Sequence, residues 1–561
     1  MDCASLILSN DTYDTIVAKD EEREPLVEPL CVQPIDEEYS VWYFDRSRVL
    51  PLSIRNYSYT AIPKCFYLMD TTSMEISGIS ALQNNPTLSL KGQGVFVGII
   101  DTGIDYNNRL FKNQDGSSRI YSIWDQTALP DTYRLPEGFL YGVEYTKSLI
   151  NQALTSETPG SIVPQVDEIG HGTFLASLAA GNVDLENDFV GAAPESEILV
   201  VKLKPAKQNL RDFFYLSDTT PIYQENDIMA AIRYMDGVAA REGRPLVILI
   251  GMGSNQGSHT GSGPLSIMSN RVGAKRERCM VFPAGNQASK RHHFYGEAIS
   301  VLNPVKVEMD VQADFSGFCM ELWAFAPELV RVVVQSPTGQ RSDGNFPYAE
   351  ETQTTRFVFE NTTLSIDYRI AGRQNGDLLV FFRFSNVVRG IWTVLVYPEN
   401  AITGAFHIWL PIREETEDDI TFLRPNPDTT ITMPSSARIP ITVGGYNGLT
   451  DALYLDSGRG YDALGLVKPD FCAPCVEVKG AGLRDNFVTY TGTSVGAAIT
   501  AGACAQLLQW GVVEGNVPGM NTVEVKNTLI RGCKRDINTT YPNRELGFGK
   551  LDVYQSFENL R

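Results

Sequence analysis

The sequence of 561 residues contains no run of about 18 apolar residues, the length that a membrane-spanning helix needs. Its first residues, MDCASLILSNDTYDTIVAKDEE, have neither the basic segment nor the long apolar segment of a secretory signal. We therefore predict no membrane span and no export signal. These absences favour a protein that stays in the cytoplasm or is carried with an intracellular structure.

Positive charge is also scarce. The 47 Lys and Arg residues stand against 67 Asp and Glu residues, which gives a net charge of −20. Such an acidic surface argues against nucleic acid as the main partner. Solubility is the favoured interpretation of the acidic balance, and attraction of a basic substrate segment is the alternative.

The nine cysteines are scattered along the chain, and we expect most of them to be reduced and buried. Cys472 and Cys475 have the spacing of a metal-binding pair, but no second cysteine or histidine pair at zinc-site spacing accompanies them. We predict no metal and no cofactor. The neighbouring His292 and His293 are predicted to be solvent-exposed rather than metal ligands.

The order of apolar segments predicts an α/β fold. Buried parallel strands are expected at 94–103, 197–203, 245–254, 278–286 and 439–446, with helices opening at 171 and 225 and near Ser494. Strands that alternate with helices predict a doubly wound, mostly parallel sheet. Between these segments, residues 291–435 form many short β-like runs separated by turn residues, which predicts an inserted all-β jelly roll or sandwich.

We accordingly divide the chain into four parts. Residues 1–58 are predicted to form a small α+β unit. The α/β domain comprises residues 59–290 and 436–561, and the β module of residues 291–435 is inserted into it.

Four polar residues occupy the ends of predicted elements. Asp101 ends a strand in IIDTG, Asn286 follows one in PAGN, and His171 in GHGT and Ser494 in TGTSVGAA each begin a helix. Because ligands gather at the carboxyl ends of strands in such sheets, all four are expected on one edge.

These residue types suit nucleophilic catalysis. An imidazole can take the proton of a serine hydroxyl while a buried carboxylate orients the ring. The Asn286 amide and the backbone N–H of Ser494 can stabilise an oxyanion. Each signal alone has another interpretation: Asp-Thr-Gly also occurs in turns and aspartic proteases, Gly-Thr-Ser in helix caps, and a lone histidine is usually structural. The order Asp, His, Asn, Ser makes chance a poor explanation.

With these segments, and with VGAAPESEILVVKL and KPDFCAPC, the chain resembles the subtilisin-like serine proteases, or subtilases. The resemblance implies a triad of Asp101, His171 and Ser494 and an oxyanion residue Asn286. SYTAIPKC, LKGQGVFVGIIDTGIDY and GTSVGAAITAG, with the β insert, are similar to the Csp germination proteases of spore-forming Clostridia. That family implies a prodomain, a jelly-roll insert and proteolytic activation of a spore cortex-lytic enzyme precursor.

The resemblance also implies where a peptide binds. Subtilases hold the substrate as an added β-strand, and Gly251, Met252, Gly253 and Ser254 match one wall of that cleft. The other wall follows residues 201–203 and enters a long loop over 205–224. The chain's own prodomain is expected at the active site, with self-cleavage in residues 53–62. The remaining hypotheses are a catalytically silent signalling or binding protein with the same fold, and a partner-binding role for the β module.

Overall fold

The computed structural model describes residues 3–18, 27–68, 77–83, 89–129, 134–344, 352–371, 376–412 and 420–560. An eight-stranded sheet in the order β24-β23-β12-β10-β5-β8-β6-β7 forms its centre, and every neighbouring pair is parallel except β6–β7. The strands are β5 (Phe96–Asp101), β6 (Ile120–Asp125), β7 (Val143–Thr146), β8 (Glu197–Lys202), β10 (Leu246–Ile250), β12 (Arg278–Pro283), β23 (Ile441–Tyr446) and β24 (Phe471–Pro474). The predicted α/β sheet is confirmed.

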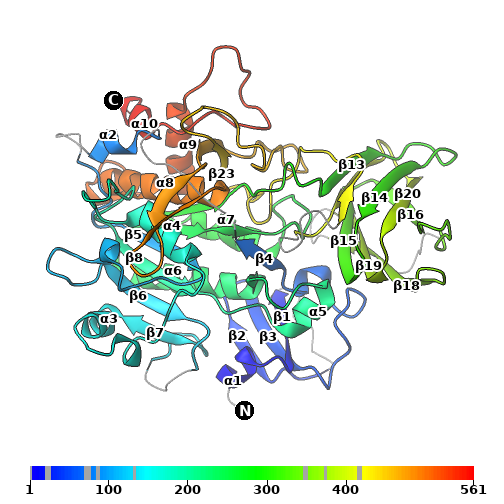
Figure 1. The fold of residues 1–561 in the computed structure, drawn as a ribbon, viewed down its shortest axis with the longest axis horizontal. Helices are drawn as coiled ribbons and strands as arrows, with labels where there is room; N and C mark the ends of the chain where they lie inside the picture. The colour runs from blue at the N-terminus through cyan, green and yellow to red at the C-terminus, as the bar shows by residue number, and fades with distance from the viewer. Residues whose placement is uncertain are drawn as a thin grey trace.

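Helices cover both faces of this sheet (Figure 1). Alternating side chains of one strand enter opposite cores: Val97 and Ile99 pack with α4 (His171–Ala180) and α8 (Thr493–Leu508), whereas Phe96 and Ile100 pack with α6 (Glu225–Glu242) and α7 (Pro264–Gly273). Burial on both faces explains why the strands are apolar throughout. The remaining helices are α1 (Cys3–Leu8), α2 (Ile79–Gln83), α3 (Lys147–Leu154), α5 (Gln208–Phe214), α9 (Thr522–Gly532) and α10 (Val553–Glu558).

One stretch of helix, Thr493–Val513, is long and apolar enough to cross a membrane by length and composition alone. It comprises α8 and the π-helical turn η6 (Gln509–Val513), and 89% of its most apolar window is buried inside the protein. Its apolar character is accounted for by its place in the core between the sheet and α4.

The N-terminal unit pairs three antiparallel strands in the order β1-β3-β2 and packs them, with α1, onto the α6 side of the central sheet. Its strands are β1 (Thr12–Ala18), β2 (Cys31–Pro34) and β3 (Tyr39–Asp45), and a disulfide joins Cys3 to Cys31. At the interface Asp14 Oδ1 forms a buried ion pair with Lys207 Nζ, and Asp14 Oδ2 accepts a 2.8 Å hydrogen bond from Gln224 Nε2. The other seven cysteines are unpaired and buried, as predicted.

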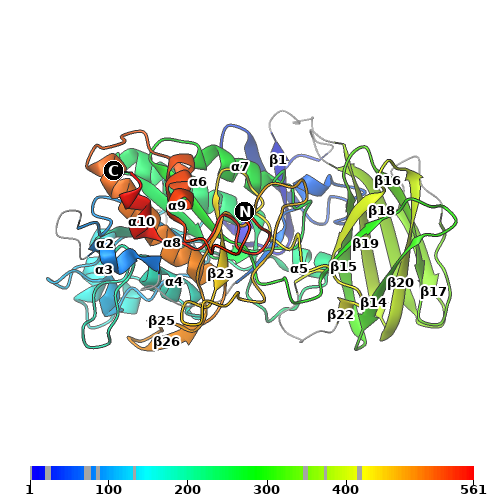
Figure 2. The same ribbon diagram turned by 90° about the horizontal axis from the view of Figure 1, so that it is seen from above.

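The β module lies at one end of the long axis of the molecule, where two antiparallel sheets pack face to face (Figure 2). One sheet has the order β13-β21-β15-β19-β18-β17 and the other β16-β20-β14-β22. The strands are β13 (His293–Glu297), β14 (Val305–Val311), β15 (Phe315–Ala324), β16 (Leu329–Gln335), β17 (Thr352–Phe357), β18 (Thr362–Ala371), β19 (Asp377–Val387), β20 (Gly390–Asn400), β21 (Ala405–Trp409) and β22 (Ile420–Phe422). The predicted β insert is therefore an antiparallel two-sheet module.

His292 and His293 are buried, so the prediction that they are solvent-exposed is wrong. His293 lies where β13 meets β21, and its Nε2 accepts a 2.9 Å hydrogen bond from Nδ1 of His407, while its own Nδ1 donates to the Asn426 carbonyl. The rings stack on Trp409. Tertiary packing at the edge of the module, which the local sequence does not reveal, explains their burial.

This histidine pair makes the stability of the protein depend on pH. Burial lowers the pKa of His407 to about 3 and the pKa of His293 well below its usual range. Below the unfolded-state pKa of about 6.5, the unfolded chain therefore binds protons that the folded chain does not. We expect the melting temperature to fall as the pH drops below about 6.5, and to fall less in the double variant His293→Phe/His407→Phe. Melting temperatures measured from pH 8 to about 4 test this expectation. The same dependence of melting temperature on pH in the parent protein and in the double variant would contradict it.

Candidate active site

Three of the four predicted residues mark the ends of regular elements. Asp101 is the last residue of β5, His171 the first of α4, and Ser494 the second of α8, while Asn286 follows β12 by three residues. Because β5 and β12 run parallel through β10, their carboxyl ends lie on one edge of the sheet. Asp101, His171 and Ser494 are all buried.

Asp101 and His171 are in direct contact. The Asp101 Oδ1 atom lies 2.8 Å from His171 Nδ1, and it also accepts a 2.8 Å hydrogen bond from the backbone N–H of Thr102. Because the carboxylate oxygen is an acceptor, Nδ1 is the protonated nitrogen of a neutral ring. This leaves Nε2 as the nitrogen that can accept a proton.

A second carboxylate, Asp167, fixes the approach to α4. Its Oδ1 accepts from Thr102 Oγ1 at 2.8 Å and from the Gly170 N–H at 2.8 Å, and its Oδ2 accepts from Thr173 N–H and Oγ1 at 2.9 and 2.7 Å. It therefore ties the residue after Asp101 to the first turn of the helix that carries His171. Sequence reasoning missed Asp167, although an acidic residue just before a helix N-terminus is a capping signal.

Asn286 is oriented by the first turn of α8. Its Oδ1 accepts hydrogen bonds from the N–H and the Oγ1 hydroxyl of Thr493, both at 3.0 Å, and Thr493 Oγ1 accepts from the Gly285 N–H at 3.0 Å. A backbone N–H only donates, so the atom facing it is the amide oxygen. The amide nitrogen, Nδ2, is consequently the end that can donate to a bound group beside Ser494.

The predicted wall, Gly251 to Ser254, divides into three parts. A Cβ on Gly251 would lie 2.9 Å from Asp101 Oδ2 and 3.2 Å from His171 Cε1, so this glycine lets the strand pass directly beside the pair. Met252 and Gly253 form β11, and Ser254 exchanges backbone hydrogen bonds with Met433 at 3.0 and 2.8 Å. Ser254 is therefore not available for pairing with a peptide.

The wall already holds a strand of the chain itself. Strand β4 (Cys65–Leu68) lies between β11 (Met252–Gly253) and β9 (Ile222–Gln224) in an antiparallel three-stranded sheet. Met252 pairs with Leu68, and Tyr223 pairs with Phe66. The region 205–224, predicted as a long loop, thus contains α5 and the second wall strand.

Residues 53–62, where self-cleavage was expected, lie elsewhere. The Ile54 carbonyl accepts a 2.9 Å hydrogen bond from Arg369 Nε, and the Tyr59 hydroxyl donates to Glu321 Oε1 at 2.6 Å. Both partners belong to the β module. This segment packs against the module because its apolar side chains join the core around Trp323 and Phe381.

Comparison with known proteins identifies the family of the chain. The model of the subtilase family matches residues 92–354 and 418–549. The structure of the Clostridium perfringens CspB protease is 28% identical, has a TM-score of 0.76, and the similarity covers 86% of this chain and 96% of that one. The PII-type proteinase of Lacticaseibacillus paracasei is 26% identical over 206 residues, which are 36% of this chain and 9% of the proteinase.

The subtilisin-like protease SBT1.9 of Arabidopsis thaliana is 32% identical over 118 residues, which are 20% of this chain and 16% of that protein. The matches thus span a small part of these two curated relatives. The family model, in contrast, covers well over half of this chain and includes all four predicted site residues. The chain belongs to the subtilase family.

Proposed function

We propose that the protein is a serine endopeptidase in which Ser494 is the nucleophile, His171 the general base and Asp101 the group that orients His171. The observation that carries this proposal is the 2.8 Å contact between Asp101 Oδ1 and His171 Nδ1 on the edge of the sheet where α8 begins. A serine hydroxyl is a weak nucleophile until a neighbouring base takes its proton.

The reaction follows from these roles. Nε2 of His171 takes the Ser494 hydroxyl proton as Oγ attacks the peptide carbonyl, and the imidazolium that forms is stabilised by Asp101. Nδ2 of Asn286 and the backbone N–H of Ser494, at the positive end of α8, donate to the oxyanion. The imidazolium then protonates the leaving amine, which leaves an acyl-enzyme, and water activated by His171 hydrolyses the ester.

We propose that residues 1–68 act as a prodomain whose final strand occupies the peptide cleft. The N-terminal unit packs on α6, and β4 forms backbone pairs with both walls as an added substrate strand does. Leu68 lies opposite Met252, and the preceding wall residue, Gly251, lies against His171. The chain leaving Leu68 is thus directed toward the reacting groups, so we place the self-cleaved bond within residues 69–76, outside the described residues.

Intact mass and N-terminal sequencing of the purified full chain test this proposal. We expect two fragments that stay associated, with the new N-terminus at one of residues 70 to 76. A chain that remains at 62.0 kDa after prolonged incubation would favour the alternative, a catalytically silent subtilase whose cleft is filled by its own strand. A cut within residues 53–62 would contradict the position of the cleaved bond that we infer from the register of β4.

The similarity to CspB supports a narrower proposal about the substrate. We propose that the enzyme resides in a spore-forming bacterium and activates the precursor of a spore cortex-lytic enzyme during germination. Incubation of the processed protein with such a precursor, followed by N-terminal sequencing, tests this role separately from self-cleavage. A precursor that remains intact while a peptide substrate is cleaved would overturn the germination role alone.

A further inference from the structure

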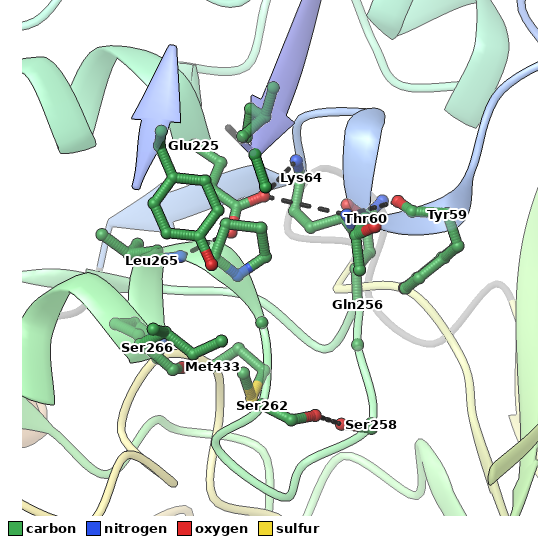
Figure 3. A pocket seen from close by; sticks show the side chains of 18 of the residues that line it. Tyr59, Thr60, Lys64, Glu225, Gln256, Ser258, Ser262, Leu265, Ser266 and Met433 are labelled. Carbon is green, nitrogen blue, oxygen red and sulfur yellow. Dashed lines mark hydrogen bonds and ion pairs between the residues drawn. The ribbon is translucent and has the colours of Figure 1, made fainter. Parts of the chain in front are cut away.

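The residue that precedes the cleft strand, Lys64, is a buried cation. Its Nζ lies 3.7 Å from Glu225 Oε2 and donates to the carbonyls of Tyr59 and Ile62 at 2.8 and 2.6 Å. The Lys64 and Glu225 side chains are 7% and 4% exposed. Figure 3 shows the two side chains directed toward one another.

Glu225 belongs to the body of the protein and not to the N-terminal segment. It is the first residue of α6 and directly follows wall strand β9. Its Oε1 accepts a 3.2 Å hydrogen bond from the Leu265 N–H, and its Oε2 accepts one of 3.2 Å from the backbone N–H of Lys64. The Glu225 carboxylate is thus held in place by α7 and contacts both the backbone and the side chain of Lys64.

A second buried carboxylate, Glu321 of the β module, strengthens the negative charge of this region. Its Oε2 accepts from Trp323 Nε1 and from the Gly257 N–H, both at 2.9 Å. Burial lowers the pKa of Lys64, and the charges of Glu225 and Glu321 act against that effect. If the N-terminal segment left, two buried carboxylates would have lost the cation that compensates them.

Lys64 and Glu225 border a cavity of about 60 Å³ between the N-terminal unit, the α/β domain and the β module, whose lining also includes Phe66, Gln256, Leu265 and Trp323. The cavity lies beside the start of β4, upstream of the part of the strand that approaches His171. There is therefore room beside the aliphatic part of the Lys64 side chain. The residues around it contact a part of the bound strand that is remote from the cleaved bond.

We propose that Glu225, supported by Glu321, forms a subsite of the cleft that selects a basic residue in the substrate, at the position that Lys64 occupies. Lys64 precedes Leu68 by four residues, and the cleaved bond follows residue 69 or a later one, so the selected residue lies at the sixth position or further upstream of that bond. This inference rests on the proposed peptidase function and adds a specificity that the triad does not supply. Truncating one partner of a buried charge pair weakens binding strongly, because the remaining charge is left unpaired.

Peptides spanning residues 59–76, with Cys65→Ser, test the subsite with the self-cleaved protein after its N-terminal segment has been displaced. We expect kcat/KM to be at least about tenfold higher for Lys or Arg at position 64 than for Met, which has a similar length without charge. The variant Glu225→Gln is expected to lose this preference while it still cleaves the Met peptide. The control Glu242→Gln, at the far end of the same helix, is expected to keep the preference.

Self-cleavage of the full chain provides a second measurement. Lys64→Met, Glu225→Gln and the double variant are compared by their first-order rate constants, and the double variant is expected to be no slower than the slower single variant. Equal kcat/KM for the Lys and Met peptides would overturn the subsite while the peptidase function stands. So would additive effects of Lys64→Met and Glu225→Gln on the free energy of activation of self-cleavage in the double variant. Absence of all cleavage in the parent protein would overturn the peptidase function and the subsite with it.

Discussion

Replacement of Ser494 by Ala is expected to leave the chain uncut, as a single species of 62.0 kDa. The substitution removes only the hydroxyl that attacks the carbonyl, and loss of this nucleophile costs about 10⁶ in kcat in a related protease. Because Ser494 is buried in the first turn of a helix of small residues, alanine fits the site and favours the helix. Intact mass spectrometry after expression and after prolonged incubation measures the result.

The matched control is Ser156→Ala, which changes a partly exposed serine after α3. This variant should be processed like the parent protein. Processing of the Ser494→Ala chain at the same bond would point to another protease as the source of the cut. It would also remove the main support for self-cleavage.

The second large effect is expected for Asp101→Asn, with self-cleavage slowed about 10⁴-fold, as for the same change in a Ser-His-Asp protease. An asparagine amide can offer its N–H₂ group to Nδ1 and thereby stabilise the other tautomer, with the proton on Nε2. A proton on Nε2 prevents His171 from accepting the serine proton. First-order rate constants of self-cleavage after refolding measure the loss.

Asp115→Asn serves as the control for this change. Asp115 is an exposed carboxylate that accepts hydrogen bonds from Ser117 in the turn before β6. It should cleave at the rate of the parent protein. A rate for Asp101→Asn within tenfold of the parent value would mean that the carboxylate does not set the tautomer of His171, and would contradict its assigned role.

The central sheet could be predicted from the sequence because its strands are buried on both faces. The run around Ile99, the run around Ile248 and the run around Val281 are apolar throughout, and each ends in a glycine or a polar residue. Since parallel strands end on a common edge, the approach of Asp101 to His171 followed from the pattern. Short polar motifs at strand and helix ends therefore indicate where a site lies even when its residues are far apart in the sequence. Asp101 and His171, for example, are separated by 70 residues.

The rest depended on contacts between distant segments. Nothing near Lys64 in the sequence indicates Glu225, and nothing near residues 65–68 shows that they pair with both walls of the cleft. The burial of His293 likewise results from a partner, His407, far along the chain. Tertiary pairing of this kind overrides local polarity, so these features could be identified only from the folded structure.

Labelling with a fluorophosphonate, which reacts with activated serines, tests the central claim most directly. We expect the self-cleaved protein, with its N-terminal segment displaced, to be labelled at Ser494, and we expect His171→Ala to abolish the label, because the hydroxyl then has no base. Mass spectrometry of the labelled peptide identifies the serine. A parent protein that is folded, cut and free of its N-terminal segment, yet unlabelled at Ser494, would contradict the account.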